Sequence, residues 1–204
     1  ELRLADGNNI EPVYRPWEKK KKKLQKIFEY CITDTSINVL NYGISGDTAA
    51  MGLARMDEML LHKPDAVIVC FGLNDSTKDM DGINEYKESL KEIFKKLQGV
   101  QTIFMTPNAT NSSVDKFETN VDIIRIMEET AKRQNGGIMD AYIECACKVC
   151  GEYNVPVCDC YKIWKDMEKS GIDILNLLSN KINHPTEELH WLFAYELFKT
   201  IIKM

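Results

Sequence analysis

Short apolar runs alternate with helical patterns along almost the whole chain, and this alternation constrains the fold more than any other feature. Short apolar runs bounded by turn residues predict buried strands of a parallel sheet. They are Ile37–Tyr42, Ala66–Phe71, Thr102–Met105 and Val155–Cys158, with a weaker candidate at Leu2–Ala5. Helical periodicity occupies the intervals, at Trp17–Tyr30, Thr48–Leu61, Ile83–Leu97, Val121–Gln134, Ile138–Tyr153 and Glu187–Lys203. Because alternating strands and helices form parallel sheets through right-handed crossovers, we expect a three-layer α/β/α sandwich with about five parallel strands.

Length and composition predict one ordinary globular domain. The chain has 204 residues, of which 44% are apolar, enough for a single domain over residues 1–204 with its own core. A net charge of −5 argues against a nucleic-acid partner. No apolar stretch approaches the roughly 18 residues of a membrane span, and we find no signal-peptide pattern. We therefore expect a cytoplasmic protein; because the chain begins with Glu1 rather than Met, a trimmed start and secretion stay open. The sequence does not define the oligomeric state.

Seven cysteines, without the regular spacing of a secreted framework, favour a reducing compartment. Five of them cluster, at Cys145, Cys147, Cys150, Cys158 and Cys160. We expect the first three on a helix and the last two on a strand. Only Cys147 and Cys150 have the C-x-x-C spacing that zinc sites prefer. We therefore interpret the cluster as buried small side chains and expect no metal or cofactor.

Polar and turn-forming residues gather just after the predicted strands, where parallel α/β sheets place their functional loops. After Tyr42, two glycines allow backbone amides to approach a ligand, and a helix begins right after them. Asn74 follows the next strand and offers a side-chain amide. The backbone N–H of Gly46 and the side-chain N–H of Asn74 could together form an oxyanion hole. Each of them alone is also consistent with a helix cap or a turn.

Near the end of the chain, His184 precedes a final helix that we expect Thr186 to cap. A histidine fixed there is well placed for general-base chemistry, although a single histidine is more often structural. We interpret His190 as a surface or packing residue. Asn108 and Asn111 match the glycosylation acceptor pattern, which we interpret only as a polar loop over the presumed site.

Three blocks, taken in order, resemble one family, the SGNH hydrolases, also called GDSL-type esterases and lipases. Asn41–Arg55 resembles the family's glycine block and the helix after it, Phe71–Asp75 its G-x-N-D block, and Asn183–Thr186 its terminal histidine block. The resemblance extends over nearly the whole chain. It implies a flavodoxin-like sandwich and a serine esterase that acts on small acyl or acetyl esters, with esters of carbohydrates as one option.

The resemblance also implies residue roles. The oxyanion hole would consist of the nucleophile's own backbone N–H, Gly46 and Asn74, and His184 would be the general base. A small-molecule ester is the expected partner, and no cofactor is implied.

The nucleophile block departs from the family pattern. The family opens with G-D-S-x, and the matching stretch is Ala5–Asn9, which is A-D-G-N-N. Trp17 follows at about the distance at which relatives have a tryptophan, which supports this register. Gly7 then occupies the nucleophile position and has no side chain that could attack an ester. Losing the nucleophile lowers turnover by roughly 10⁶ in such enzymes, and about 10³ over water remains from the oxyanion hole and binding.

The acid that orients the histidine is altered as well. The family usually has Asp three residues before the histidine; here that residue is Lys181, and Asn180 precedes it. An asparagine cannot stabilise an imidazolium as a carboxylate does. Asp173, Glu187, Glu188 or a backbone carbonyl are the alternatives for this role.

Another nucleophile and another register are also alternatives. Neither Ser45 nor Ser76 sits at a strand-to-helix elbow, and we expect Cys70 to be buried. The nucleophile block could instead lie upstream of residue 1. We predict an acyl-ester hydrolase impaired at Gly7; the alternative is an inactive family member that binds a ligand or partner through the same cleft. A third hypothesis is hydrolysis by a water that His184 activates directly.

Overall fold

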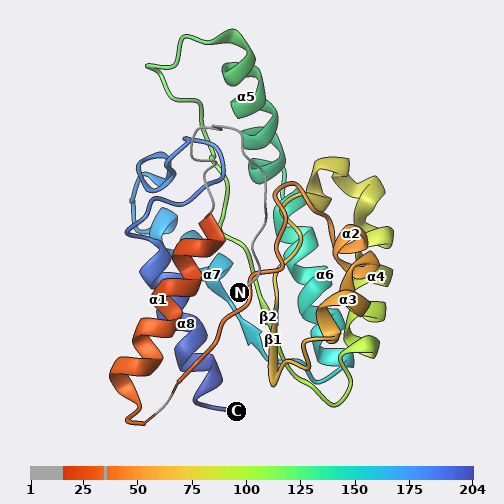
Figure 1. Ribbon diagram of the computed structural model, residues 1–204. Helices are drawn as coiled ribbons and strands as arrows, with labels where there is room; N and C mark the ends of the chain where they lie inside the picture. Colours follow the sequence, from red (N-terminus) through yellow and green to blue (C-terminus); the bar gives the residue numbers. More distant parts are fainter. Residues whose placement is uncertain (1–15, 35) are drawn as a thin grey trace, which may run out of the picture.

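The protein has an α/β fold that is mostly helical, with a small parallel sheet (Figure 1). The computed structural model describes residues 16–34 and 36–204, with side chains from residue 23 onward. The helices are α1 (Pro16–Cys31), α2 (Ala49–Ala54), α3 (Met56–Leu60), α4 (Ile83–Lys96), α5 (Val121–Asn135), α6 (Ile138–Glu152), α7 (Cys160–Lys169) and α8 (His190–Ile201). The strands are β1 (Ala66–Val69), β2 (Gln101–Met105) and β3 (Val157–Cys158), and two 3₁₀ segments are η1 (Asp75–Gly82) and η2 (Ile174–Leu177).

Among the described residues, three parallel strands pair in the order β1-β2-β3. Val67 lies opposite Thr102, and Phe104 lies opposite Val157. One face of β2 contributes Ile103 to a core cluster that also contains residues of α1, α7 and α8. The opposite face contributes Phe104 to a second cluster with residues of α4 and α6. Successive residues of a strand point to opposite faces, so β2 is covered on both sides. The count of about five strands stays a prediction.

The expected strand Ile37–Tyr42 is not a strand: the segment forms no ladder with any described strand. Ile37 nonetheless packs against the core cluster beside α1 and α8. A short apolar run predicts burial, but a strand also needs a neighbour for its backbone hydrogen bonds, and among the described residues β1 pairs only with β2. The weaker candidate Leu2–Ala5 lies outside the described residues.

The expected helix Thr48–Leu61 divides into α2 and α3 at Arg55, whose backbone angles are φ −104° and ψ 0°. The Arg55 guanidinium donates to the carbonyl oxygen of Tyr42 over 3.0 Å and forms an ion pair with Asp47. These contacts bind the end of α2 to the loop before it.

Two boundaries near the cysteines and the last helix correct the sequence interpretation. Cys160 does not belong to a strand; it begins α7, because the Asp159 side chain caps this helix by accepting from the backbone N–H of Lys162 at 3.0 Å. The last helix begins at His190 with Leu189 at the cap position, so Thr186 does not cap it.

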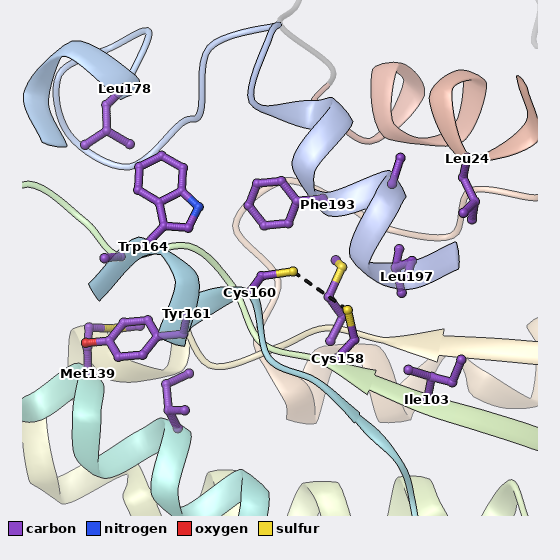
Figure 2. Packing of buried hydrophobic residues seen from close by; sticks show 14 of the residues in the cluster. Leu24, Ile103, Met139, Cys158, Cys160, Tyr161, Trp164, Leu178, Phe193 and Leu197 are labelled. Carbon is purple, nitrogen blue, oxygen red and sulfur yellow. Dashed lines mark hydrogen bonds between the residues drawn. The ribbon is translucent and has the colours of Figure 1, made fainter. Parts of the chain in front are cut away.

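The larger core cluster contains Cys158 and Cys160, which Figure 2 shows beneath Phe193 and Leu197 of α8. Their sulfur atoms lie 3.8 Å apart. Cys150 is also buried, and Cys145 and Cys147 are half-buried. The interpretation of this group as packed small side chains is therefore correct for three of the five and partly correct for the other two.

Candidate active site

The loop of residues 43–48, here called the glycine loop, ends at the start of α2. The Asn41 side chain accepts from the backbone N–H of Gly43 over 3.0 Å, and the Thr48 hydroxyl caps α2 by accepting from the N–H of Met51. Gly46 has φ +86°, a conformation that a side chain strongly disfavours. This glycine therefore meets a backbone requirement of the turn.

The segment of residues 72–75, here called the Asn74 loop, follows the end of β1 and lies against the glycine loop. Asn74 Nδ2 donates to the carbonyl oxygen of Asp47 over 2.9 Å. The Asp75 carboxylate accepts from the N–H of Ala49 at 2.8 Å through Oδ1 and from the N–H of Gly72 at 2.9 Å through Oδ2. Two side chains of the Asn74 loop thus hold the backbone of the glycine loop and of the first residue of α2.

Asp75 is 5% exposed, so its charge is largely removed from water. Burial raises the pKa of the Asp75 carboxyl above its ordinary value because desolvation disfavours the charged form, and the hydrogen bonds from Ala49 and Gly72 oppose this rise. Burial also raises the pKa of Tyr86 and Tyr142, the latter to about 12, so both phenols stay protonated near neutral pH.

The segment of residues 178–186, here called the histidine loop, carries His184 and is held by local hydrogen bonds. Asn180 Oδ1 accepts from the backbone N–H groups of Ile182, Asn183 and His184 at 3.1, 3.0 and 2.9 Å. The carbonyl oxygen of His184 accepts from the backbone N–H of Ser179 at 2.7 Å. The backbone position of His184 is therefore fixed from both sides.

The structure clarifies what the two residues near the expected acid position do. The side-chain oxygen of Asn180 accepts only from the loop backbone in the bonds described above, and its Nδ2 donates to Asn183 Oδ1 over 2.9 Å. Lys181 has φ +57°, and its ammonium donates to the carbonyl oxygen of Leu175 over 3.1 Å. Asn180 thus stabilises the conformation of the histidine loop, and Lys181 connects this loop to η2.

A third loop, which follows β2, connects the histidine loop to the sheet. Asn108 Nδ2 donates to the carbonyl oxygen of Asn183 over 2.9 Å, and the N–H of Asn111 donates to the carbonyl oxygen of Ile182 over 2.8 Å. Asn108 and Asn111 are 4% and 0% exposed. The sequence was interpreted as a polar loop over the presumed site; the structure adds that both asparagines are buried and support the histidine loop. Their position just after a strand was the available signal.

A hollow of about 50 Å³, here called the polar hollow, lies between the Asn74 loop and the histidine loop. Leu73, Asn74, Met139 and Asn183 are among the residues that line it. Asn74 of the G-x-N-D block and the neighbour of His184 therefore border one space. Gly7 lies outside the described residues.

The other sequence candidates differ in their placement, and Ser76 lines the polar hollow. Ser76 is buried and donates to the carbonyl oxygen of Leu73 over 2.8 Å, Ser45 is exposed in a turn, and Cys70 is half-buried rather than buried as expected. His190 is 0% exposed, so of the two interpretations offered, packing is correct. No group of three or more His, Cys, Asp or Glu in the described chain could hold a metal ion.

The sequence matches the model of the GDSL-like lipase/acylhydrolase family over residues 4–192. This range contains the glycine, Asn74 and histidine loops, and the chain belongs to that family. No curated protein matches it significantly.

Solved structures of esterases have the same fold. An acetyl xylan esterase, AlAXEase, aligns with a TM-score of 0.70 and 17% identity over 90% of this chain and 91% of its own. A lipase/acylhydrolase from Enterococcus faecalis aligns with a TM-score of 0.68 and 20% identity, covering 89% and 84%. Axe2, an acetylxylan esterase from Geobacillus stearothermophilus, aligns with a TM-score of 0.67 and 20% identity, covering 87% and 78%. Across the described residues, no helix combines the length and apolar character that a membrane crossing requires.

Proposed function

We propose that the protein is an acyl-ester hydrolase for small acyl or acetyl esters, with an oxyanion hole and a histidine general base. The Asn74 amide has two hydrogens. One is bound to the carbonyl oxygen of Asp47, and the other is available to the developing oxyanion, together with the N–H of Gly46. His184 takes the proton of the attacking hydroxyl, which belongs to a serine at position 7 or to a water molecule. It then gives this proton to the leaving alcohol.

The hydrogen bonds of Asp75 to both Ala49 and Gly72 are the observation that supports this proposal most strongly. An oxyanion hole acts through donors fixed before the reaction, so that no reorganisation is needed as charge develops. The Asp75 carboxylate supplies this fixation because it joins the Asn74 loop to the first residue of α2, which directly follows the glycine loop. Asn180 is a positioning residue here, because it holds the backbone beside His184.

Gly7 impairs this chemistry in the register in which Ala5–Asn9 matches the nucleophile block of the family. Without a nucleophilic side chain, the oxyanion hole and base give slow hydrolysis at most, on the order of 10³ over water. The family fold with cores on both faces of β2 supports the finer assignment of a three-layer sandwich that forms one domain. The alternative function is a binding module that holds an ester or its product in the same cleft.

The test is steady-state hydrolysis of 4-nitrophenyl acetate by the chain as written, by Gly7→Ser, and by Gly7→Ser combined with His184→Ala. We expect a very low rate for the first, a large gain for the second and loss of that gain for the third. Asn74→Ala in the Gly7→Ser background should reduce kcat by roughly 10²–10³, as expected for one oxyanion donor. If the chain as written already hydrolyses the ester and Gly7→Ser changes nothing, the nucleophile lies elsewhere and the assignment of Gly7 is wrong.

A further inference from the structure

Six of the nine residues that line the polar hollow have hydroxyl or amide side chains. The hydrogens of all four hydroxyls are already committed, that of Thr110 to Gln134 Oε1 at 3.1 Å. Ser76 Oγ donates to the carbonyl oxygen of Leu73 at 2.8 Å, and Thr77 Oγ1 donates to that of Asn74 at 2.7 Å. Thr130 Oγ1, on α5, donates to a carbonyl oxygen of its own helix at 2.8 Å. A hydroxyl that donates to a fixed carbonyl still has a free lone pair. These side chains therefore offer acceptors to a ligand.

Arg133, also on α5, supplies donors to the same hollow. Its Nε donates to Asp79 Oδ1 over 3.2 Å, while Nη2 lies 3.8 Å from Glu129 Oε2, beyond hydrogen-bond distance. The Arg133 side chain is 21% exposed and lines the hollow, so part of it is accessible to a ligand there. Asp79 is itself held in place, because its carbonyl oxygen accepts from the Tyr142 hydroxyl at 2.7 Å.

The charges around Arg133 select against anions. One guanidinium lies beside two carboxylates, those of Asp79 and Glu129, so its positive charge is already compensated. An anionic group entering the hollow would meet no net attraction. A neutral ligand that both donates to the hydroxyl oxygens and accepts from Arg133 satisfies every group, and a polyhydroxylated molecule has that property.

The size and position of the hollow indicate which half of an ester lies there. A volume of about 50 Å³ holds a few water molecules, and therefore one edge of a sugar ring, but no long alkyl chain. Asn183, the residue before His184, lines the hollow. Because the general acid protonates the leaving oxygen, the alcohol half of the substrate lies on the side of His184.

We propose that the polar hollow binds the neutral, polyhydroxylated alcohol half of the ester, a sugar, and that Arg133 determines this specificity. The assignment of the sugar to the leaving half rests on the proposed function. The binding of the sugar itself does not, since the hollow is present whether or not the chain hydrolyses esters.

The first experiment measures binding and needs no catalysis. The chain as written is titrated with methyl β-xyloside, with its anionic counterpart methyl β-glucuronide, and with an aliphatic alcohol. We expect saturable binding of the neutral glycoside only. Arg133→Met should weaken that binding at least roughly tenfold, because hydrogen bonds to a charged donor are among the stronger ones. Lys132→Met, an equal loss of charge at the neighbouring exposed position of α5, should change nothing.

Arg133→Met also removes the partner of Asp79 and could unfold the hollow, so Thr130→Val is a second variant. It keeps the side-chain volume and removes one acceptor, and it should weaken glycoside binding severalfold with unchanged thermal stability. Failure of the folded chain to bind the neutral glycoside, tighter binding of the glucuronide, or full affinity in both folded variants would each overturn the proposal.

The second experiment separates this proposal from the proposed function. In the Gly7→Ser background, Arg133→Met should raise KM for an acetylated methyl xyloside by a larger factor than KM for 4-nitrophenyl acetate, which has no sugar hydroxyls. If Gly7→Ser hydrolyses neither ester but glycoside binding still depends on Arg133, the proposed function fails and the sugar site stands. If both esters are hydrolysed and Arg133→Met affects them equally, the specificity role of Arg133 is wrong.

Discussion

The carboxylate of Asp75 accepts a hydrogen bond of 2.8 Å from the backbone N–H of Ala49, the first residue of α2, across 26 residues of sequence. Its other oxygen accepts from Gly72 in its own loop. One buried side chain therefore fixes the start of α2 relative to the end of β1. The two proposed oxyanion donors, on Gly46 and Asn74, lie on the segments that this carboxylate joins.

The first prediction concerns the stability that Asp75 provides. Asp75→Asn keeps the shape but puts an NH₂ group opposite one of the two N–H donors, which leaves a buried donor without an acceptor. We expect the free energy of unfolding to fall by roughly 1.5–3 kcal/mol in urea denaturation, the usual range for a hydrogen bond to a charged group. Asp81→Asn, the same change at an exposed position, is the control and should have little effect. Equal effects of the two substitutions would contradict the role of Asp75.

The second prediction concerns how the difference in free energy of unfolding between the chain as written and Asp75→Asn depends on pH. Because burial raises the folded-state pKa of Asp75 above 3.8, the folded protein binds a proton at this site more readily than the unfolded chain. Its contribution to the free energy of unfolding therefore increases as the pH falls through the folded pKa, and Asp75→Asn lacks this contribution. The stability difference between the two proteins should widen from neutral pH toward pH about 4 in urea titrations. A difference that stays constant with pH would contradict the raised pKa.

Helices were predicted well from the sequence where the apolar pattern repeats over several helical turns. The expected helix Ile83–Leu97 matches α4, and Ile138–Tyr153 matches α6, within a residue at each end. Short elements were less predictable: α7 was missed because its apolar start follows β3 without a break. The signal that could have revealed it is Asp159, a good helix cap, with Trp164 one helical turn after Cys160.

The Asn74 loop was predictable because it follows β1, and the glycine and histidine loops were predictable because they resemble blocks of the family, whereas the residues that support these loops were not. Asp75 belongs to the G-x-N-D block, but only the fold shows that Ala49 is its hydrogen-bond partner. The sequence did not indicate a role for Arg133. This residue lies on α5, far in sequence from every block, and is one of several charged residues of that helix. A side chain that reaches a site across tertiary structure leaves no local pattern.

The third prediction tests Asn180 as a support of the histidine loop. Asn180→Ala removes the acceptor of three backbone N–H groups, whereas Asn180→Asp keeps it. We expect Asn180→Ala to lower the free energy of unfolding by about 1 kcal/mol, since water replaces part of the lost bonds at this exposed position. In the Gly7→Ser background it should also lower kcat for 4-nitrophenyl acetate, and Asn180→Asp should restore most of the stability. If Asn180→Asp is as unstable as Asn180→Ala, the acceptor oxygen is not what holds the loop.

The last prediction concerns Gly52 in α2, where the helix packs against Phe71, two residues after the end of β1. A Cβ atom at Gly52 would lie 2.2 Å from the ring of Phe71, so Gly52→Ala must displace this ring from the core cluster beside α4. We expect a loss of about 1–3 kcal/mol in the free energy of unfolding, the usual cost of overpacking. The matched control is Gly151→Ala in α6, where a Cβ meets nothing within 4 Å. There, alanine's higher helix propensity should stabilise the protein by up to about 1 kcal/mol. Thermal and urea unfolding of the two variants should therefore shift in opposite directions; a shift in the same direction would show that α2 does not pack on Phe71 as described.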